Sequence, residues 1–199
     1  GAVGEEVIDG VTFVRRGVWW SVHLYAMFYY IFRFRKTVDI IVDEVHWYPF
    51  FSILYARHKT VLLVCEVADT LFFRLLPYPF ALLARFVEKI YILLYRNGPV
   101  LAISKSTRVA LLREGFDSAG ITLLPMGVTL PKVATRYPKA TTLTMIVVAR
   151  LQKLKGIADA IAAFARIQSD IPSANLWIVG GDSEGYQKDL ERIAKNLGV

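Results

Sequence analysis

The chain has 199 residues, a net charge of +7 at pH 7 and 55% apolar residues, and its mean hydropathy is +0.42. This length suits one large domain or parts of two smaller ones, and the basic balance favours anionic partners: nucleotides, phosphates, nucleic acids or acidic lipid headgroups. The single cysteine, Cys65, excludes an intrachain disulfide and a cysteine-based zinc cluster.

The N-terminal segment combines aromatic and basic residues. The first ten residues are acidic and lack the apolar region of a secretory signal peptide. Residues 18–34 are predicted to form a helix, but the charge-free stretch at 17–32 is shorter than the about 20 residues that a transmembrane helix needs. An interfacial helix fits better, because residues 13–36 hold five Arg or Lys residues, nine aromatic residues and no acid.

Short apolar runs and longer helical segments alternate through the rest of the first half. The runs contain β-branched residues and show little alternation, which predicts strands buried on both faces of a parallel sheet. Gly115 is the predicted C-cap of the last helix in this half. Alternating elements of this kind indicate an α/β doubly wound sheet. We expect strands at residues 39–42, 61–65, 100–103 and 121–124, and helices at residues 80–95 and 107–114.

The composition changes at residues 130–142, which contain two prolines, three threonines and no long apolar run. Such a segment predicts an interdomain linker. We therefore place a first domain at residues 1–130, a linker at 131–142 and a second domain at 143–199. The α/β pattern restarts after the linker, with strands expected at 143–149 and 175–179 and helices at 156–168 and 184–197.

Two basic side chains follow the predicted strand at residues 143–149. Ligands of open α/β sheets bind beyond the carboxyl ends of the strands, so Arg150 and Lys155 are placed to converge on one anion. Arg can grip a diphosphate with two donors, Lys adds a compact charge, and the next helix, predicted from Gly156, adds its positive N-terminal end. From spacing alone, a solvated charged loop explains the pattern equally well.

Other polar motifs give weaker signals. Gly180 and Gly181 lie between a strand and a helix, where a phosphate could bind, but a tight turn is the favoured interpretation. Cys65 is best explained as a small buried side chain. The three histidines lack metal-ligand spacing, and His46 is the best of them as a polar site residue.

Three segments of the second half share an order and spacing with a known family. They are Arg-Leu-x-x-x-Lys-Gly at residues 150–156, Pro-x-x-x-Leu-x-Ile-Val-Gly at 172–180 and Leu-Gly-Val at 197–199. Together they resemble the donor-binding domain of glycosyltransferase family 4. The resemblance implies a retaining sugar transfer from a nucleoside-diphosphate donor, with Arg150 and Lys155 on the donor diphosphate and no metal. Gly156 belongs to the same donor-binding segment.

The first half resembles the same family at residues 43–52, 102–107, 111–116 and 121–128. The resemblance implies that Ser104 lies at a strand end on the acceptor side. It also implies that Gly127 lies on the donor side, in the turn that closes the N-terminal domain. The family usually has Asn-Gly-Val at that turn, whereas this chain has Met126 before Gly127.

The chain also departs from the family. Many members have a His where this chain has Cys65 and Glu66. Glu66 and Asp69 are therefore our candidates for binding acceptor hydroxyl groups, together with His46 and Ser104. The glycine-rich N-terminal loop and the acidic Glu-x7-Glu segment of the family have no counterpart here, so we expect a fragment that lacks both ends and is inactive alone.

Residues 13–36 and 71–96 both mix basic and aromatic side chains. Such segments suit an anionic membrane surface, where rings lie at headgroup depth and cations meet acidic lipids. The alternative is that the rings fill the core and the cations are solvated. Nucleic-acid binding ranks lower, because no RNA- or DNA-binding signature is present.

We therefore predict an α/β protein of the GT-B type, with two Rossmann-like doubly wound domains that are both incomplete. Its predicted function is sugar transfer to a lipid-linked or glycan acceptor at the cytoplasmic face of a membrane, without a cofactor or a metal and without nucleic acid. One alternative is an inactive, glycosyltransferase-like module that binds a membrane or a partner. The other is a different α/β nucleotide-binding enzyme, such as a dehydrogenase, although the Gly-x-Gly-x-x-Gly fingerprint of dehydrogenases is absent from these residues.

Overall fold

A computed structural model describes residues 4–45, 47–129 and 138–199. The chain divides into two compact units, Gly1–Thr129 and Leu130–Val199, and each is described by itself. His46 and most of the predicted linker lie outside the described residues, and the predicted domain limits stay a prediction. Each unit contains a parallel sheet and helices, which confirms the α/β class.

The first unit begins with a β-hairpin that the sequence analysis missed. Strands β1 (Glu5–Ile8) and β2 (Val11–Val14) pair antiparallel. Asp9 and Gly10 form the turn, with φ angles of 50° and 80°. An Asp-Gly pair readily adopts two successive left-handed residues, which match the twist of a two-residue hairpin.

Four parallel strands form the main sheet of the first unit, in the order β3-β4-β5-β6. The predicted strands are confirmed with small shifts, the largest at β3, which starts and ends later than expected. The prediction that they are buried on both faces is wrong. In β4, Leu62 and Val64 are buried while Val61 and Leu63 are only half-buried. The strands are β3 (Ile41–Val45), β4 (Thr60–Val64), β5 (Val100–Ala102) and β6 (Ile121–Leu123).

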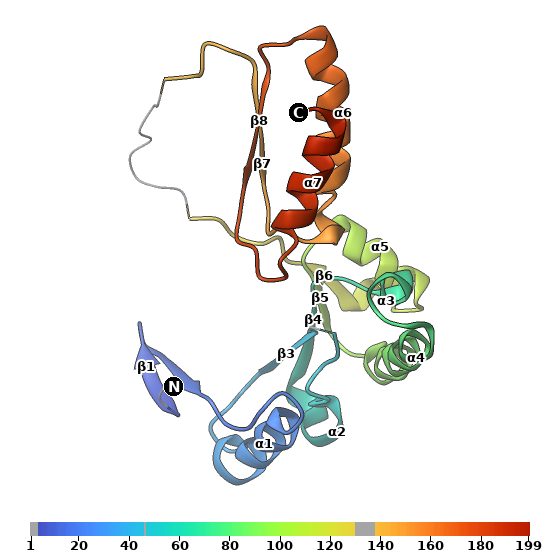
Figure 1. Cartoon of the computed structure of the whole chain (residues 1–199). Helices are drawn as coiled ribbons and strands as arrows, with labels where there is room; N and C mark the ends of the chain where they lie inside the picture. The colour runs from blue at the N-terminus through green and yellow to red at the C-terminus, as the bar shows by residue number, and fades with distance from the viewer. Residues whose placement is uncertain (1–3, 46, 130–137) are drawn as a thin grey trace. The chain divides into compact units, whose positions relative to one another are not determined.

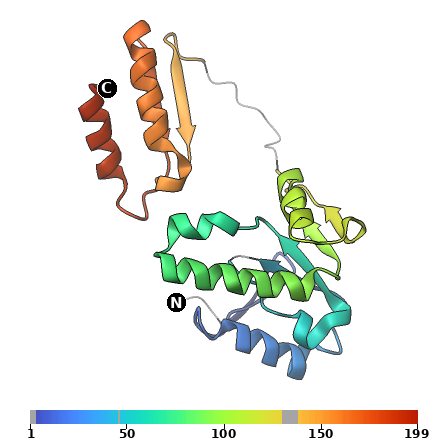
Figure 2. The same ribbon diagram turned by 90° about the vertical axis from the view of Figure 1, so that its right-hand side faces the viewer.

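The helices α3, α4 and α5 lie on one side of this sheet (Figure 1), and α4 runs along it (Figure 2). Tyr91 and Ile92 of α4 pack against Leu62 and Val64 in the core of the unit. Gly115, with a φ of 88°, follows α5 in the left-handed conformation expected of a C-cap residue. The helices are α1 (Val22–Tyr29), which continues as the π-helical η1 (Tyr30–Phe34), α2 (Ile53–Ala56), α3 (Phe72–Leu75), α4 (Tyr78–Tyr95) and α5 (Lys105–Arg113), with short 3-10 turns at η2 (Arg57–Lys59), η3 (Asp69–Leu71) and η4 (Ser118–Gly120).

The second unit consists of two parallel strands and two helices. Strand β7 (Thr144–Val148) leads through the 3-10 turn η5 (Lys153–Lys155) into α6 (Ile157–Asp170), and β8 (Asn175–Val179) leads into α7 (Gln187–Leu197). Both helices lie on the same side of the two strands (Figure 1). Their shared core contains Leu151, Ile157, Ile161 and Leu190. The apolar faces of α6 and α7 therefore point to the strands, and the turns after β7 and β8 lie at one edge.

Candidate functional site

Arg150 and Lys155 both lie in the segment that joins β7 to α6, and both are exposed. Neither side chain makes an ion pair or hydrogen bond with another residue in the described part of the chain. Their backbone is nevertheless fastened. The N–H of Leu151 donates to the carbonyl oxygen of Gly181 at 2.9 Å, which ties the segment to the turn that follows β8. The two cations are thus free to bind an anion from solvent.

The N-terminus of α6 lies directly beside Lys155. Gly156 precedes the helix with a φ of 66°, a left-handed conformation that favours glycine. No side chain caps the first turn of α6. Its first N–H groups are therefore open to an anion, while the carboxylate of Asp159 in the first turn opposes part of the positive charge of the helix end.

The N-terminus of α7 differs, because the turn before it supplies its own carboxylate. Asp182 accepts hydrogen bonds from the N–H groups of Gln187, Tyr186 and Glu184 at 3.0, 2.9 and 3.2 Å. These bonds, that of Gln187 first, hold the pKa of Asp182 below its ordinary value. The geometry favours the tight-turn interpretation over a phosphate site at Gly181.

Gly180 permits a close approach between the ends of β8 and β7. A Cβ atom at this position would lie 1.8 Å from the carbonyl oxygen of Ala149, a contact that no side chain tolerates. At Gly181, by contrast, a Cβ atom would meet nothing within 4 Å. Gly180 therefore sets the distance between the turns that follow the two strands, one of which carries Arg150.

Two predicted acceptor-side residues and the predicted donor-side Gly127 follow strands of the first unit. Because carboxyl ends of parallel strands meet at one edge, Glu66 after β4, Ser104 after β5 and Gly127 after β6 share that edge. Glu66 and Gly127 are exposed. Ser104 caps α5, because its Oγ accepts the N–H of Thr107 at 3.0 Å.

Asp69 is engaged in an ion pair, with Oδ1 2.8 Å from Nη2 of Arg85. Its φ is 41°, which is uncommon for a residue other than glycine. His46 lies outside the described residues. Among those that the structure describes, no three His, Cys, Asp or Glu side chains are arranged to hold a metal ion, and a metal-independent reaction stays a prediction.

Cys65 is less buried than expected from the sequence, and His23 packs against aromatic side chains. Cys65 is half-buried, and burial, followed by the nearby Glu44 carboxylate, raises the pKa of its thiol. The imidazole of His23 stacks on Tyr48 and Phe50, with ring centroids 5.0 and 4.6 Å away. Burial lowers the pKa of His23, although Asp43 opposes the shift.

Two buried carboxyl groups escaped the sequence analysis. Asp43 in β3 is 2% exposed and Glu88 in α4 is 1% exposed. Asp43 accepts the N–H groups of Phe50 and Ser52 at 2.7 and 2.8 Å, and so fixes the segment after β3. Glu88 fixes the segment after β4 in the same way, because it accepts the N–H groups of Ala68 and Asp69. The sequence does set Glu88 apart, because it is the only acidic residue in the basic, aromatic segment 71–96.

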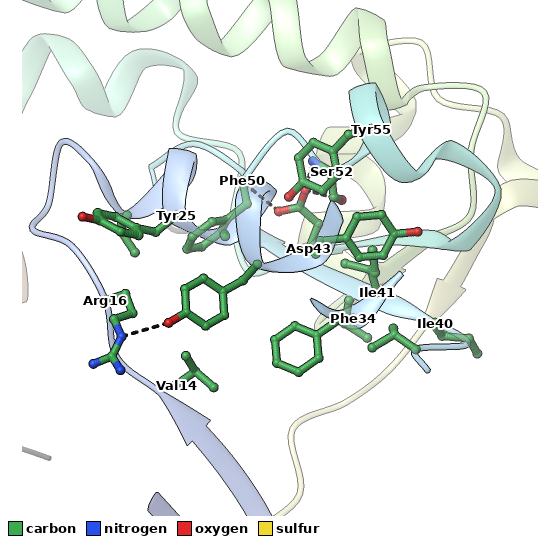
Figure 3. Close-up of a pocket in the computed structure, with 16 residues that line it drawn as sticks. Val14, Arg16, Tyr25, Phe34, Ile40, Ile41, Asp43, Phe50, Ser52 and Tyr55 are labelled. Atoms are coloured by element: carbon green, nitrogen blue, oxygen red, sulfur yellow. Dashed lines mark hydrogen bonds between the residues drawn. The ribbon is translucent and has the colours of Figure 1, made fainter. Parts of the chain in front are cut away.

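An apolar pocket of 420 Å³ lies between β2, α1 and β3 (Figure 3). Arg16 lies at its edge and donates from Nε to the hydroxyl of Tyr29 at 2.9 Å. Burial raises the pKa of Tyr55, which lines the pocket, to about 12. None of the predicted site residues that the structure describes lines this pocket.

The basic aromatic segments are divided between core and surface. In residues 71–96, Phe72, Tyr91 and Tyr95 are buried, whereas Phe80 and Phe86 are exposed. No helix in the described ranges is long and apolar enough to cross a membrane.

Exposed apolar side chains lie along α1 and η1, one at every fourth residue. This row, here called the α1 stripe, consists of Trp20, Leu24, Phe28 and Phe32, which are 66, 55, 49 and 81% exposed.

Comparison with known families identifies one part of the chain. Residues 134–199 match the family of glycosyl transferases group 1. No curated protein matches the chain. The match covers the whole of the described second unit, including Arg150, Lys155 and Gly156, and supports a glycosyltransferase domain there.

Proposed function

We propose that this chain is part of a glycosyltransferase that moves a sugar from a nucleoside-diphosphate donor to a hydroxyl acceptor. One observation carries the proposal: the segment that matches glycosyl transferases group 1 contains two exposed, unpaired cations beside the uncapped N-terminus of α6. Cations beside a helix N-terminus bind phosphate groups, and a diphosphate is the anionic part of the proposed donor. The GT-B architecture and membership of glycosyltransferase family 4 are part of the proposal and rest on the sequence resemblance.

In the proposed reaction, the bond between the anomeric carbon of the donor sugar and the diphosphate oxygen breaks, and the electron pair stays on the diphosphate. The acceptor oxygen bonds to the anomeric carbon, its proton passes to the leaving diphosphate oxygen, and the configuration is retained. Arg150 and Lys155 stabilise the growing negative charge, a role that can contribute about 3–4 kcal/mol per group. Gly156 leaves room for the donor beside the N-terminus of α6. No metal or cofactor takes part.

On the acceptor side, we assign hydroxyl binding to Glu66, His46 and Ser104, whereas the carboxylate of Asp69 is paired with Arg85. The acceptor is a lipid-linked sugar or a glycan. The α1 stripe supports a location at a membrane, because exposed rings and aliphatic side chains on a helix without acids suit the headgroup region. Residues 71–96 contribute further exposed rings and cations. We place the protein at the cytoplasmic face of the membrane, with anionic lipid as a partner.

The test uses the product of the complete reading frame and a panel of nucleotide sugars. Nucleotide release is followed with and without a lipid extract as the source of acceptor. Release from one donor, increased by the extract, supports the proposal and identifies the donor. A folded protein that binds anionic vesicles but releases nucleotide from no donor would instead indicate an inactive, membrane-binding module, the alternative that the α1 stripe also fits.

A further inference from the structure

The loop after β4 is held at both ends by buried side chains. At its start, Oγ1 of Thr107 donates to the carbonyl oxygen of Cys65 at 2.9 Å. At its end, the carboxyl group of Glu88 accepts the N–H of Ala68 at 2.8 Å and that of Asp69 at 3.0 Å. The backbone between these two points is therefore fixed by contacts from α5 and α4.

The burial of Glu88 needs an explanation. Its side chain is 0% exposed, and burying a carboxylate is costly unless donors surround it. Besides the two loop N–H groups, Nη1 of Arg85 donates to it at 2.7 Å and the hydroxyl of Tyr91 lies at 3.5 Å. An apolar side chain would avoid the cost altogether, so the carboxyl group is best explained by the loop backbone that it fixes.

The fixed loop also contains local strain. Asp69 adopts a φ of 41°, and left-handed residues other than glycine cost on the order of 1–3 kcal/mol unless their surroundings hold them. Here Glu88 binds the N–H of Asp69, and Arg85 binds its carboxylate at 2.8 Å. Strain held in this way is a common feature of functional loops.

Glu66 lies between the two fastened ends. Its side chain is exposed and has no hydrogen bond or ion pair with the residues that the structure describes. Neighbouring carboxylates are engaged: Asp69 with Arg85, and Glu114 with Arg85 and Lys89. Glu66 is thus the one acid of this loop that is available to a ligand.

We propose that Glu88 is a positioning residue for acceptor binding. It fixes the loop so that the carboxylate of Glu66 stands at the carboxyl edge of the sheet and accepts a hydrogen bond from an acceptor hydroxyl group. The acceptor class that this arrangement fits is a polyhydroxylated group, such as the sugar of a glycolipid. This inference rests on the proposed glycosyltransferase function.

The test compares Glu88→Gln with Glu114→Gln in the product of the complete reading frame. Glu88→Gln keeps the size but turns one acceptor oxygen into a donor that opposes a loop N–H. Glu114→Gln is the matched control, because it also alters a partner of Arg85 but contacts no loop backbone. Nucleotide release is measured with graded amounts of donor and of a lipid extract, and hydrogen exchange is measured over residues 65–71.

For Glu88→Gln we expect faster exchange in residues 65–71 and at least a tenfold rise in the half-saturating amount of extract, since a misplacement of about 1 Å can cost about 10²-fold. The half-saturating donor concentration should stay unchanged, and Glu114→Gln should resemble the unmodified protein. Unchanged acceptor dependence in an active Glu88→Gln variant would overturn the positioning role alone. Absence of release from the unmodified protein would overturn the proposed function and this role together.

Discussion

The phenolic hydroxyl of Tyr95 donates a hydrogen bond of 2.5 Å to Oδ2 of Asp43, a residue 52 positions earlier in the chain. The contact joins α4 to the edge strand β3, and both residues are 2% exposed. Burial and then the bond to Asp43 raise the pKa of Tyr95. The same carboxyl group fixes the segment after β3, so this pair ties the helix, the strand and the segment together.

Tyr95→Phe should lower the free energy of unfolding by about 1–3 kcal/mol, because a buried carboxyl group loses a donor. Urea denaturation followed by circular dichroism measures the effect. Tyr78→Phe is the matched control, since Tyr78 begins the same helix and is 69% exposed. Equal stability of the two variants would show that the bond to Asp43 contributes nothing.

Gly180→Ala should destabilise the second unit by about 1–3 kcal/mol or more, because the added Cβ atom meets a backbone carbonyl that cannot move without shifting a strand. Hydrogen exchange in peptides that cover β7 and β8 reports the loss. Gly181→Ala should leave exchange unchanged, since the space around that position is open. Similar exchange in both variants would argue against the close approach of the two strand ends.

Stability should fall as the pH drops below about 6.5, in part because of His23. Burial holds the pKa of His23 below its ordinary value in the folded protein. Between the folded pKa of His23 and about 6.5, the unfolded chain therefore binds more protons than the folded protein. The contribution of His23 to the free energy of unfolding is complete above pH 6.5 and is lost as the pH falls through that window. His23→Phe keeps a ring against Tyr48 and Phe50 but cannot titrate. Melting temperatures measured from about pH 7.5 to 5.5 should decline less for this variant; equal slopes would exclude a contribution from His23.

The α1 stripe should bind vesicles that contain phosphatidylglycerol. Phe28→Ser combined with Phe32→Ser should weaken binding at least about tenfold, since each buried ring contributes about 1.5–3 kcal/mol. Trp177→Ser is a control on the second unit, where Trp177 is 58% exposed. Vesicle sedimentation measures the binding, and added salt should weaken it. If the double variant bound vesicles as strongly as the unmodified protein, the membrane contact would lie outside the α1 stripe.

The sequence predicted the parallel strands and the long helices, because apolar β-branched runs and helical spacing are properties of each segment's own residues. It could not predict which strand face is buried. Val61, Leu62, Leu63 and Val64 are all apolar, yet only two of them face the core. The hairpin was predictable from the Asp9-Gly10 pair between apolar residues and was overlooked.

The candidate site was predictable only in part. Arg150 and Lys155 follow from their place after a strand and from a family resemblance. Asp43 was not recognisable, and Glu88 stood out only as the single acid of residues 71–96, because the partners of both are backbone N–H groups that only the folded chain brings near. The sequence likewise could not show that Glu66 is open to a ligand while Asp69 is not, because this depends on Arg85, which pairs with Asp69 in the folded chain.

The central claim is that Arg150 and Lys155 bind the donor diphosphate. Its most direct test is the turnover number for nucleotide release in Arg150→Ala and Lys155→Ala, compared with Lys153→Ala, an exposed cation of the same segment. We expect a loss on the order of 10²–10³-fold in the first two variants, little change in the control, and unaltered melting temperatures in all three. Turnover that stays unchanged in both Arg150→Ala and Lys155→Ala would contradict the assignment.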